Sequence, residues 1–79
     1  MEITYGIPVT AETSRVVVDV SDVLGRHVRS IVNRDEGRGE YRVTWDGKDD
    51  HGESVASGVY FYRLQTGNQT LTRKAVLLK

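Results

Sequence analysis

The sequence predicts an all-β fold, an immunoglobulin-like antiparallel β-sandwich of about seven short strands. Short segments alternate apolar and polar residues along most of the chain, and turn residues separate them roughly every eight to twelve positions. No stretch of useful length shows the helical period. The 79 residues contain no internal repeat and suffice for one small domain, so residues 1–79 are predicted to form a single unit.

The first two predicted strands have the clearest alternation. Residues 2–7 and residues 15–21 each place apolar side chains at every second position, so each is expected to turn one face inward. The inward residues are Ile3, Tyr5 and Ile7 in the first strand and Val16, Val18 and Val20 in the second. Pro8 ends the first strand because its nitrogen carries no hydrogen, and residues 10–14 are expected to be a polar connection.

A turn, an irregular strand and a loop follow. Residues 22–26 are predicted to turn, with Gly25 at positive φ. Residues 28–32 form a third strand in which Val28 and Ile31 are three positions apart, a spacing that predicts a β-bulge. The charged residues 34–39 include two glycines and are predicted to form an exposed loop.

The rest of the fold is expected to be organised around Trp45, the only tryptophan. It ends the predicted strand 41–45, in which Tyr41 and Val43 also point inward. A compact loop rich in Asp and Gly follows, and the aromatic strand 59–64 returns to the core. The alternation of aromatic and polar residues favours a core role over a sugar-binding platform.

The last predicted strand covers residues 69–79 and follows a hairpin turn at Gly67-Asn68. Its residues 75–78 are all apolar and show no period of two, so the sequence does not identify the inward face. A strand that is apolar on both faces is either covered on both sides or a surface that binds a partner.

Composition argues against several classes of partner. Eleven basic and eleven acidic residues give a formal net charge of zero, which disfavours nucleic acid or an anionic membrane. No apolar run is long enough for a membrane span, no signal-peptide pattern occurs, and the absence of cysteine excludes disulfides. Arginines between positions 26 and 42 alternate with acidic residues, as is typical of a solvated face, although a docking role for them stays open.

The loop after Trp45 invites a calcium-binding hypothesis. Asp46, Asp49, Asp50 and Glu53 supply carboxylate oxygens over eight residues, although not with EF-hand spacing. The alternative, which we favour, is a turn in which aspartates accept backbone N–H groups. A catalytic role for His27 or His51 would need a nucleophile and an orienting acid, for example Ser54 or Ser57 with Asp50, in a geometry that nothing in the sequence specifies. The sequence therefore predicts no catalytic residue, no metal site and no cofactor.

Five motifs follow one another along nearly the whole chain: Ile3-Thr-Tyr-Gly-Ile-Pro8, Val20-Ser-Asp-Val-Leu-Gly-Arg-His-Val-Arg29, Gly39-Glu-Tyr-Arg-Val-Thr-Trp-Asp-Gly47, Val55-Ala-Ser-Gly-Val-Tyr-Phe-Tyr-Arg-Leu64 and Thr72-Arg-Lys-Ala-Val-Leu-Leu-Lys79. In this order and spacing they resemble the C-terminal sorting domain (type A) of type IX secretion cargo, found in Bacteroidetes and related bacteria. The pattern is also similar to the immunoglobulin-like domain of the flagellar hook-capping protein. Ala75 stands where the sorting family usually has Met, and Ser21 where it usually has Tyr.

The resemblance implies a non-catalytic signal that directs a larger cargo protein through the periplasm to the cell surface or medium. Its implied partners are the outer-membrane type IX translocon and a sortase-like peptidase, and the domain itself is expected to be a monomer. We expect docking on the last strand, through Arg73, Lys74, Val76, Leu77, Leu78 and Lys79. The alternatives are a structural assembly module, as in the hook-capping protein, and a carbohydrate-binding appendage.

Overall fold

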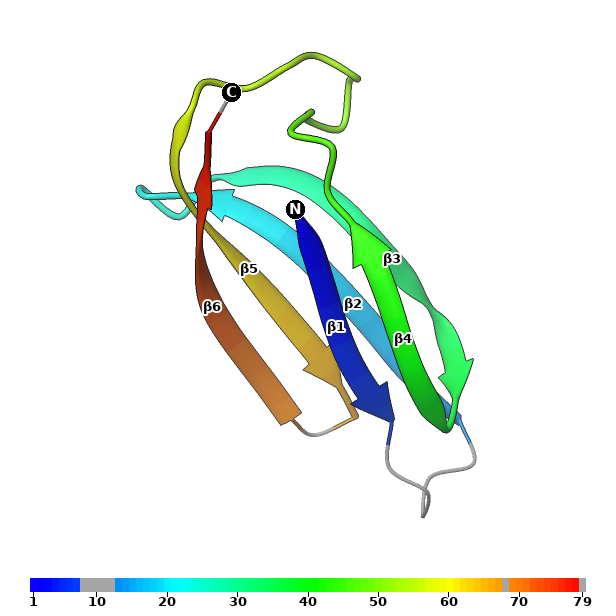
Figure 1. Ribbon diagram of the computed structural model, residues 1–79. Helices are drawn as coiled ribbons and strands as arrows, with labels where there is room; N and C mark the ends of the chain where they lie inside the picture. The colour runs from blue at the N-terminus through cyan, green and yellow to red at the C-terminus, as the bar shows by residue number, and fades with distance from the viewer. Residues whose placement is uncertain (8–12, 68, 79) are drawn as a thin grey trace.

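The chain folds into two antiparallel sheets that pack face to face (Figure 1). The structure is a computed structural model that describes residues 1–7, 13–67 and 69–78. Its strands are β1 (Glu2–Ile7), β2 (Thr13–Asp22), β3 (His27–Gly37), β4 (Gly39–Thr44), β5 (Gly58–Thr66) and β6 (Gln69–Leu77). One sheet pairs β1 with β4, and the other has the order β3-β2-β5-β6. The predicted all-β sandwich is confirmed, with six strands instead of about seven.

The described ranges contain no helix, and so none that is long and apolar enough to cross a membrane.

The larger core cluster lies where β1 faces β2. Ile3, Tyr5 and Ile7 of β1 are buried against Val16 and Val18 of β2, and Val32 of β3 completes the cluster. The sequence predicts that β1 and β2 turn these residues inward, and the structure confirms the inward face of each of the two strands. The alternation suffices because one face of each strand is buried and the other is solvated. Pro8 and residues 10–12 of the expected connection lie outside the described residues.

The second cluster forms around Trp45, directly after β4. Trp45 is 2% exposed and packs with Val20 and Tyr60. The Trp45 and Tyr60 rings meet edge to face, with their centroids 5.2 Å apart. Each polar group of the pair is satisfied locally, since Trp45 Nε1 donates to the Lys48 carbonyl and the Tyr60 hydroxyl donates to the Ala56 carbonyl. The predicted core role of Trp45 is confirmed, and its buried ring is not available as a sugar platform.

The predicted bulge in the third strand is present twice. The register between β2 and β3 shifts at Val18/Asp19 and again at Val20/Ser21. On β3 the shifts leave Ile31 and Val28 without a directly paired partner on β2. Both side chains pack against the buried clusters, so the bulges bring two apolar residues three positions apart to the same core.

The prediction of an exposed loop at residues 34–39 is wrong. The strand β3 continues to Gly37, because residues 34–37 pair with residues 13–16 of β2. Glu36 is buried, and it accepts a hydrogen bond from the Tyr5 hydroxyl of the facing sheet. The Arg34 guanidinium lies 3.7 Å from the other carboxylate oxygen of Glu36. A buried partner in another strand thus overrides the charged composition that indicated a solvated loop.

The strand β6 pairs with β5 as the predicted hairpin requires, with Thr66 opposite Gln69 and Gly67 at φ 53. Asn68, the other predicted turn residue, lies outside the described residues. Ala75 is buried opposite Tyr60, and Leu77 is half-buried, so the odd-numbered positions face inward. This settles the orientation that the apolar run 75–78 left open.

Candidate functional site

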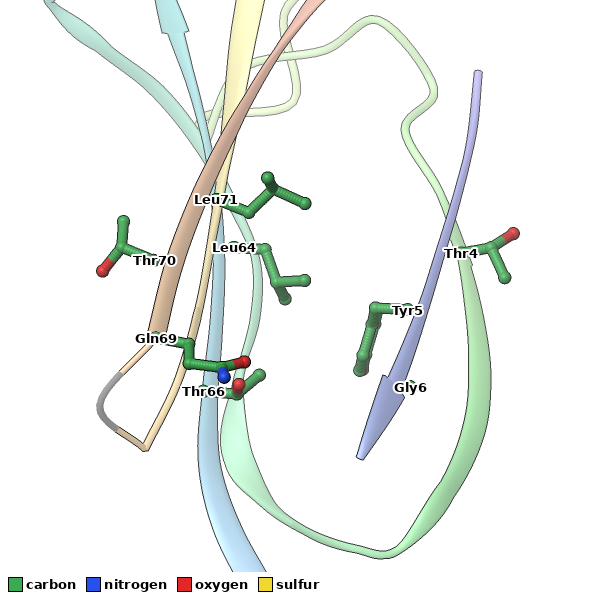
Figure 2. A pocket seen from close by; sticks show the side chains of 8 residues that line it. All are labelled: Thr4, Tyr5, Gly6, Leu64, Thr66, Gln69, Thr70 and Leu71. Atoms are coloured by element: carbon green, nitrogen blue, oxygen red, sulfur yellow. The ribbon is translucent and has the colours of Figure 1, made fainter. Parts of the chain in front are cut away.

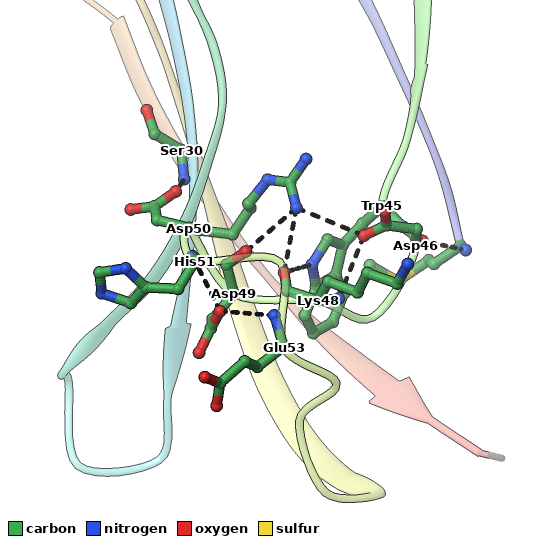
Figure 3. A network of polar contacts seen from close by, with 10 residues as sticks. Ser30, Trp45, Asp46, Lys48, Asp49, Asp50, His51 and Glu53 are labelled. Carbon is green, nitrogen blue, oxygen red and sulfur yellow. Dashed lines mark hydrogen bonds and ion pairs between the residues drawn. The ribbon is translucent and has the colours of Figure 1, made fainter.

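The acidic loop between β4 and β5 folds back over the beginning of β3 (Figure 3). Its backbone is held to β3 by Asp50 N, which donates to the Val28 carbonyl. Within the loop, Val55 N donates to the Gly47 carbonyl, and Lys48 forms an isolated bridge with Ser54. The loop is therefore a compact structure that covers the Trp45 end of the core.

Asp49 closes the tightest turn of this loop. Its Oδ1 accepts the backbone N–H of His51 at 2.9 Å and that of Glu53 at 3.0 Å. The Asp49 backbone N–H in turn donates to the Glu53 carbonyl at 2.8 Å, and Gly52 takes φ 82. The Asp49 carboxylate thus accepts hydrogen bonds from backbone N–H groups that would otherwise bond to water, as aspartates in turns commonly do.

Asp50 joins the loop to β3 through its side chain. Its Oδ1 accepts the backbone N–H of Ser30 at 2.8 Å, and its Oδ2 lies 2.6 Å from Nε2 of His27. The Ser30 N–H, followed by the contact with His27, holds the pKa of Asp50 below its ordinary value. Of the two histidines considered for catalysis, Asp50 contacts His27 of β3 and not His51 of the loop.

Arg29 of β3 contacts the loop through its guanidinium group. Its Nη1 lies 3.2 Å from the Asp49 carbonyl, 3.4 Å from the Lys48 carbonyl and 3.5 Å from Asp46 Oδ1. Asp46 also accepts the backbone N–H of Lys48 at 3.1 Å. Sequence reasoning placed Arg29 in a solvated face and missed this role, since the contacts join residues about twenty positions apart.

The candidate calcium ligands do not converge on one point. Asp46 faces Arg29, Asp49 faces the backbone of its own turn, and Asp50 faces β3 (Figure 3). Glu53 is exposed beside Asp49. Across the part of the chain that the structure describes, no three His, Asp or Glu side chains are grouped as a metal ion would need. The geometry favours the turn interpretation.

We expect that calcium is not needed for folding. Because the aspartates bond to backbone N–H groups, the melting temperature should be the same in EDTA and in millimolar calcium. Differential scanning calorimetry measures this directly. A transition that EDTA lowers and calcium restores would show that Asp46, Asp49 and Asp50 hold a metal ion.

The acid dependence of stability should reveal the Asp50 contact. The folded-state pKa is lowered, so the stabilisation is complete above the ordinary value of 3.8 and is lost as the pH falls through the folded-state pKa. Asp50→Asn should therefore melt at a lower temperature than the parent chain at neutral pH, and the difference should shrink in acid. Asp35→Asn is the matched control, because among the described residues Asp35 forms only an exposed ion pair, with N and O 3.5 Å apart. A pH-independent gap between Asp50→Asn and the parent would contradict the assignment.

The predicted docking residues of β6 are divided between its two faces. Lys74 and Val76 point outward, opposite Phe61 and Val59 of β5, and Val76 is 54% exposed. We call these four residues the β6 patch. A depression of about 450 Å³ adjoins the β6 patch, and Phe61, Arg63 and Thr72 are among the residues that line it. Because β6 is the last strand of its sheet, the β6 patch lies at an open edge.

The other predicted docking residues are placed differently. Arg73 lies opposite Tyr62 in the register of β5 and β6, at a position on the face that is turned to the other sheet, and it is exposed. Leu77 packs under the acidic loop with the Trp45 cluster, where its Cδ2 would lie 3.3 Å from a Cβ added at Gly47. Leu78 follows the strand and is 83% exposed. Lys79 lies outside the described residues.

The chain is similar to a known domain family. A family model described as "FlgD Ig-like domain" matches residues 1–70 of the chain. Neither a curated protein nor a solved structure shows a significant match.

Proposed function

The chain belongs to the FlgD Ig-like domain family, and from that premise we propose that it is a non-catalytic docking module, the sorting domain of a larger type IX secretion cargo. The family assignment accounts for the immunoglobulin-like fold and for the relation to the flagellar hook-capping protein. The sorting role is supported by the resemblance of residues 72–79 to the terminal motif of the sorting family, and by the exposed surface to which Lys74 and Val76 contribute.

The observation that carries the proposal is the β6 patch. Two apolar side chains, Val59 and Val76, lie directly opposite one another on the solvent face of an edge hairpin, and Lys74 lies beside them. Exposed apolar groups next to an open strand edge are typical of a surface that binds another protein. Lys74, the one cation of the β6 patch, would help to orient the partner, since charges at the border of an interface mainly guide association.

In this proposal the partner of the β6 patch is the outer-membrane translocon, and a sortase-like peptidase acts after passage through the membrane. The cargo would travel through the periplasm to the cell surface or medium. The domain works as a monomer without catalytic residues or a cofactor, because recognition needs only a folded surface and its exposed strand.

The test fuses the domain to the C-terminus of an exported reporter in a bacterium with a type IX system. The parent domain should deliver the reporter to the surface or medium. Lys74→Glu combined with Val76→Thr should reduce delivery on the order of tenfold, because central interface contacts often contribute about 1 kcal/mol or more each. Both positions are outward, so the purified variant should keep its melting temperature.

Arg42→Glu is the matched control, since Arg42 is exposed on β4 in the opposite sheet. It should export like the parent. Deletion of residues 73–79 is a poorer test, because it removes the buried Ala75 and would damage the core. Normal export of the Lys74 and Val76 double variant would exclude the β6 patch as the docking surface.

A structural assembly module is the second candidate, and the family match itself favours it. In that case the intact domain would export no reporter, and its role would be to pack against other subunits of an assembly.

A further inference from the structure

The two sheets of the sandwich are unequal, and the difference leaves a groove. The two-stranded sheet does not cover all of the four-stranded one, and a groove of about 470 Å³ remains between β1 and the beginning of β6 (Figure 2). Leu64 and Leu71 project into it from β5 and β6 toward Tyr5 of β1. Leu71 is 44% exposed although it lies on the inner face of its sheet. Among the described residues, no strand covers this stretch of the inner surface.

The wall of this groove is the backbone of β1. Thr4, Tyr5 and Gly6 are consecutive, and consecutive residues of a strand can line one groove only if it runs along the strand's edge. Within the described residues β1 pairs with β4 alone, so its other edge is open.

The hydrogen-bond pattern identifies which groups of β1 are free for a partner. Met1 N donates to the Trp45 carbonyl at 2.9 Å, and Trp45 N donates to the Met1 carbonyl at 2.8 Å, so these two residues form a hydrogen-bonded pair. The register from there to Ile7 is unbroken. Hydrogen-bonded and non-hydrogen-bonded pairs alternate in an antiparallel ladder, so Thr4 and Gly6 direct both N–H and C=O to the open edge. These two residues line the groove.

Within residues 2–7, this edge lacks the protection that exposed strands usually carry. The pairing of β1 with β4 contains no bulge, and the only charge on β1 is Glu2 at its start. Charged side chains, prolines and bulges are the common means of keeping other strands away. The β6 strand on the other side of the groove carries Arg73 and Lys74, but neither residue lines the groove. The β1 edge is therefore open to another strand.

We propose that this groove accepts a β-strand from a partner protein other than a second copy of this chain, and that the strand pairs with Thr4 and Gly6 and covers Leu64 and Leu71. The backbone groups of β1 require an extended chain, and the leucines require apolar side chains at alternate positions. None of the eight residues that line the groove is charged. A charged side chain on the incoming strand would find no opposite charge there, so this strand is uncharged over its paired length. The inference does not rest on the proposed sorting function, because the pairing edge belongs to β1 and no residue of the β6 patch lines the groove.

The test uses the whole chain and a capped, fluorescein-labelled peptide of about six residues, a common strand length, that alternates valine and threonine. Fluorescence anisotropy measures binding, and hydrogen exchange measures protection of the Thr4 and Gly6 amides. The control peptide has the same side chains but is N-methylated at alternate amides, which removes hydrogen-bond donors. We expect the parent peptide to bind at least about tenfold more tightly and to slow exchange at both amides.

Gly6→Pro and Gly6→Ala form a matched pair of variants. The Gly6 N–H points away from β4, so proline removes a donor from the open edge without breaking the existing ladder. An alanine Cβ would lie 3.9 Å from the Gly39 carbonyl, which is ordinary contact. Gly6→Pro should weaken peptide binding about tenfold, and Gly6→Ala by less than about twofold. Leu71→Thr, a change at a partly exposed site, should also weaken binding and does not depend on the fold of the proline variant.

Several results would overturn the proposal. The first is no binding of the peptide, and the second is equal binding of the N-methylated control. Unchanged affinity in both Gly6→Pro and Leu71→Thr would place the peptide elsewhere. Sedimentation that shows a dimer of the parent chain and a monomer of Gly6→Pro would assign the groove to a second copy of the chain.

Discussion

Replacing Trp45 with alanine should lower the free energy of unfolding by about 3–5 kcal/mol, the usual cost of removing a buried aromatic side chain. Trp45 is 2% exposed and touches the buried Val20 and Tyr60. Its removal also leaves the Lys48 carbonyl without its indole donor. A chain of 79 residues has a total stability of only roughly 4–12 kcal/mol, so the variant should be largely unfolded at elevated temperature.

Urea unfolding followed by circular dichroism measures the change in both stability and cooperativity. Leu24→Ala is the control, because Leu24 is exposed in the turn between β2 and β3 and should change stability by less than about 0.5 kcal/mol. Trp45→Phe should fall between the two, since it keeps a ring in the core but loses the bond to Lys48. A melting transition that Trp45→Ala shifts by only a degree or two would show that the indole is peripheral.

The central parts of the fold could be predicted because they depend on local period. One face of β1 and one of β2 are buried, so the alternation of Tyr5 or Val18 with polar neighbours already identifies the inward side. The spacing of Val28 and Ile31 indicated a bulge because no regular strand places both on one face. These conclusions needed no knowledge of which strands are neighbours.

The errors occurred where a distant partner decides the outcome. Glu36 is buried because Tyr5, thirty-one positions away, donates to its carboxylate, and no local pattern shows that contact. The inward face of β6 depends on its register with β5, which puts Ala75 beside Tyr60. A run of apolar residues is equally compatible with either choice until that register is known.

The candidate site shows the same division. The turn role of Asp49 could be predicted, because an aspartate bonds to backbone groups only a few positions ahead. The contacts of Asp50 with His27 and Ser30, and of Arg29 with the loop, join separate strands and could not be predicted. On β6, the sequence placed Arg73 and Lys74 together as a cationic pair, whereas the pleat directs them to opposite faces.

Breaking the hydrogen bond between Tyr5 and Glu36 should also lower the free energy of unfolding substantially. The Glu36 side chain is 4% exposed and accepts a hydrogen bond from the Tyr5 hydroxyl. Burial and the bond to Glu36 raise the pKa of Tyr5, so the hydroxyl keeps its proton and remains a donor. Tyr5→Phe deletes that donor and leaves a buried carboxylate with Arg34, 3.7 Å away, as its remaining partner. The expected loss is about 1–3 kcal/mol, the cost of an unsatisfied buried polar group.

A double-mutant cycle separates this contact from general packing. Glu36→Leu alone leaves the Tyr5 hydroxyl without its acceptor and should also destabilise. Tyr5→Phe combined with Glu36→Leu replaces both partners with apolar groups, so the double variant should be more stable than the sum of the single losses predicts, by roughly 1 kcal/mol or more. Tyr62→Phe is the control, because its hydroxyl has no hydrogen-bond partner among the described residues and its loss should be small. Strictly additive losses in the cycle would mean that β1 and β3 are not joined by this bond in solution.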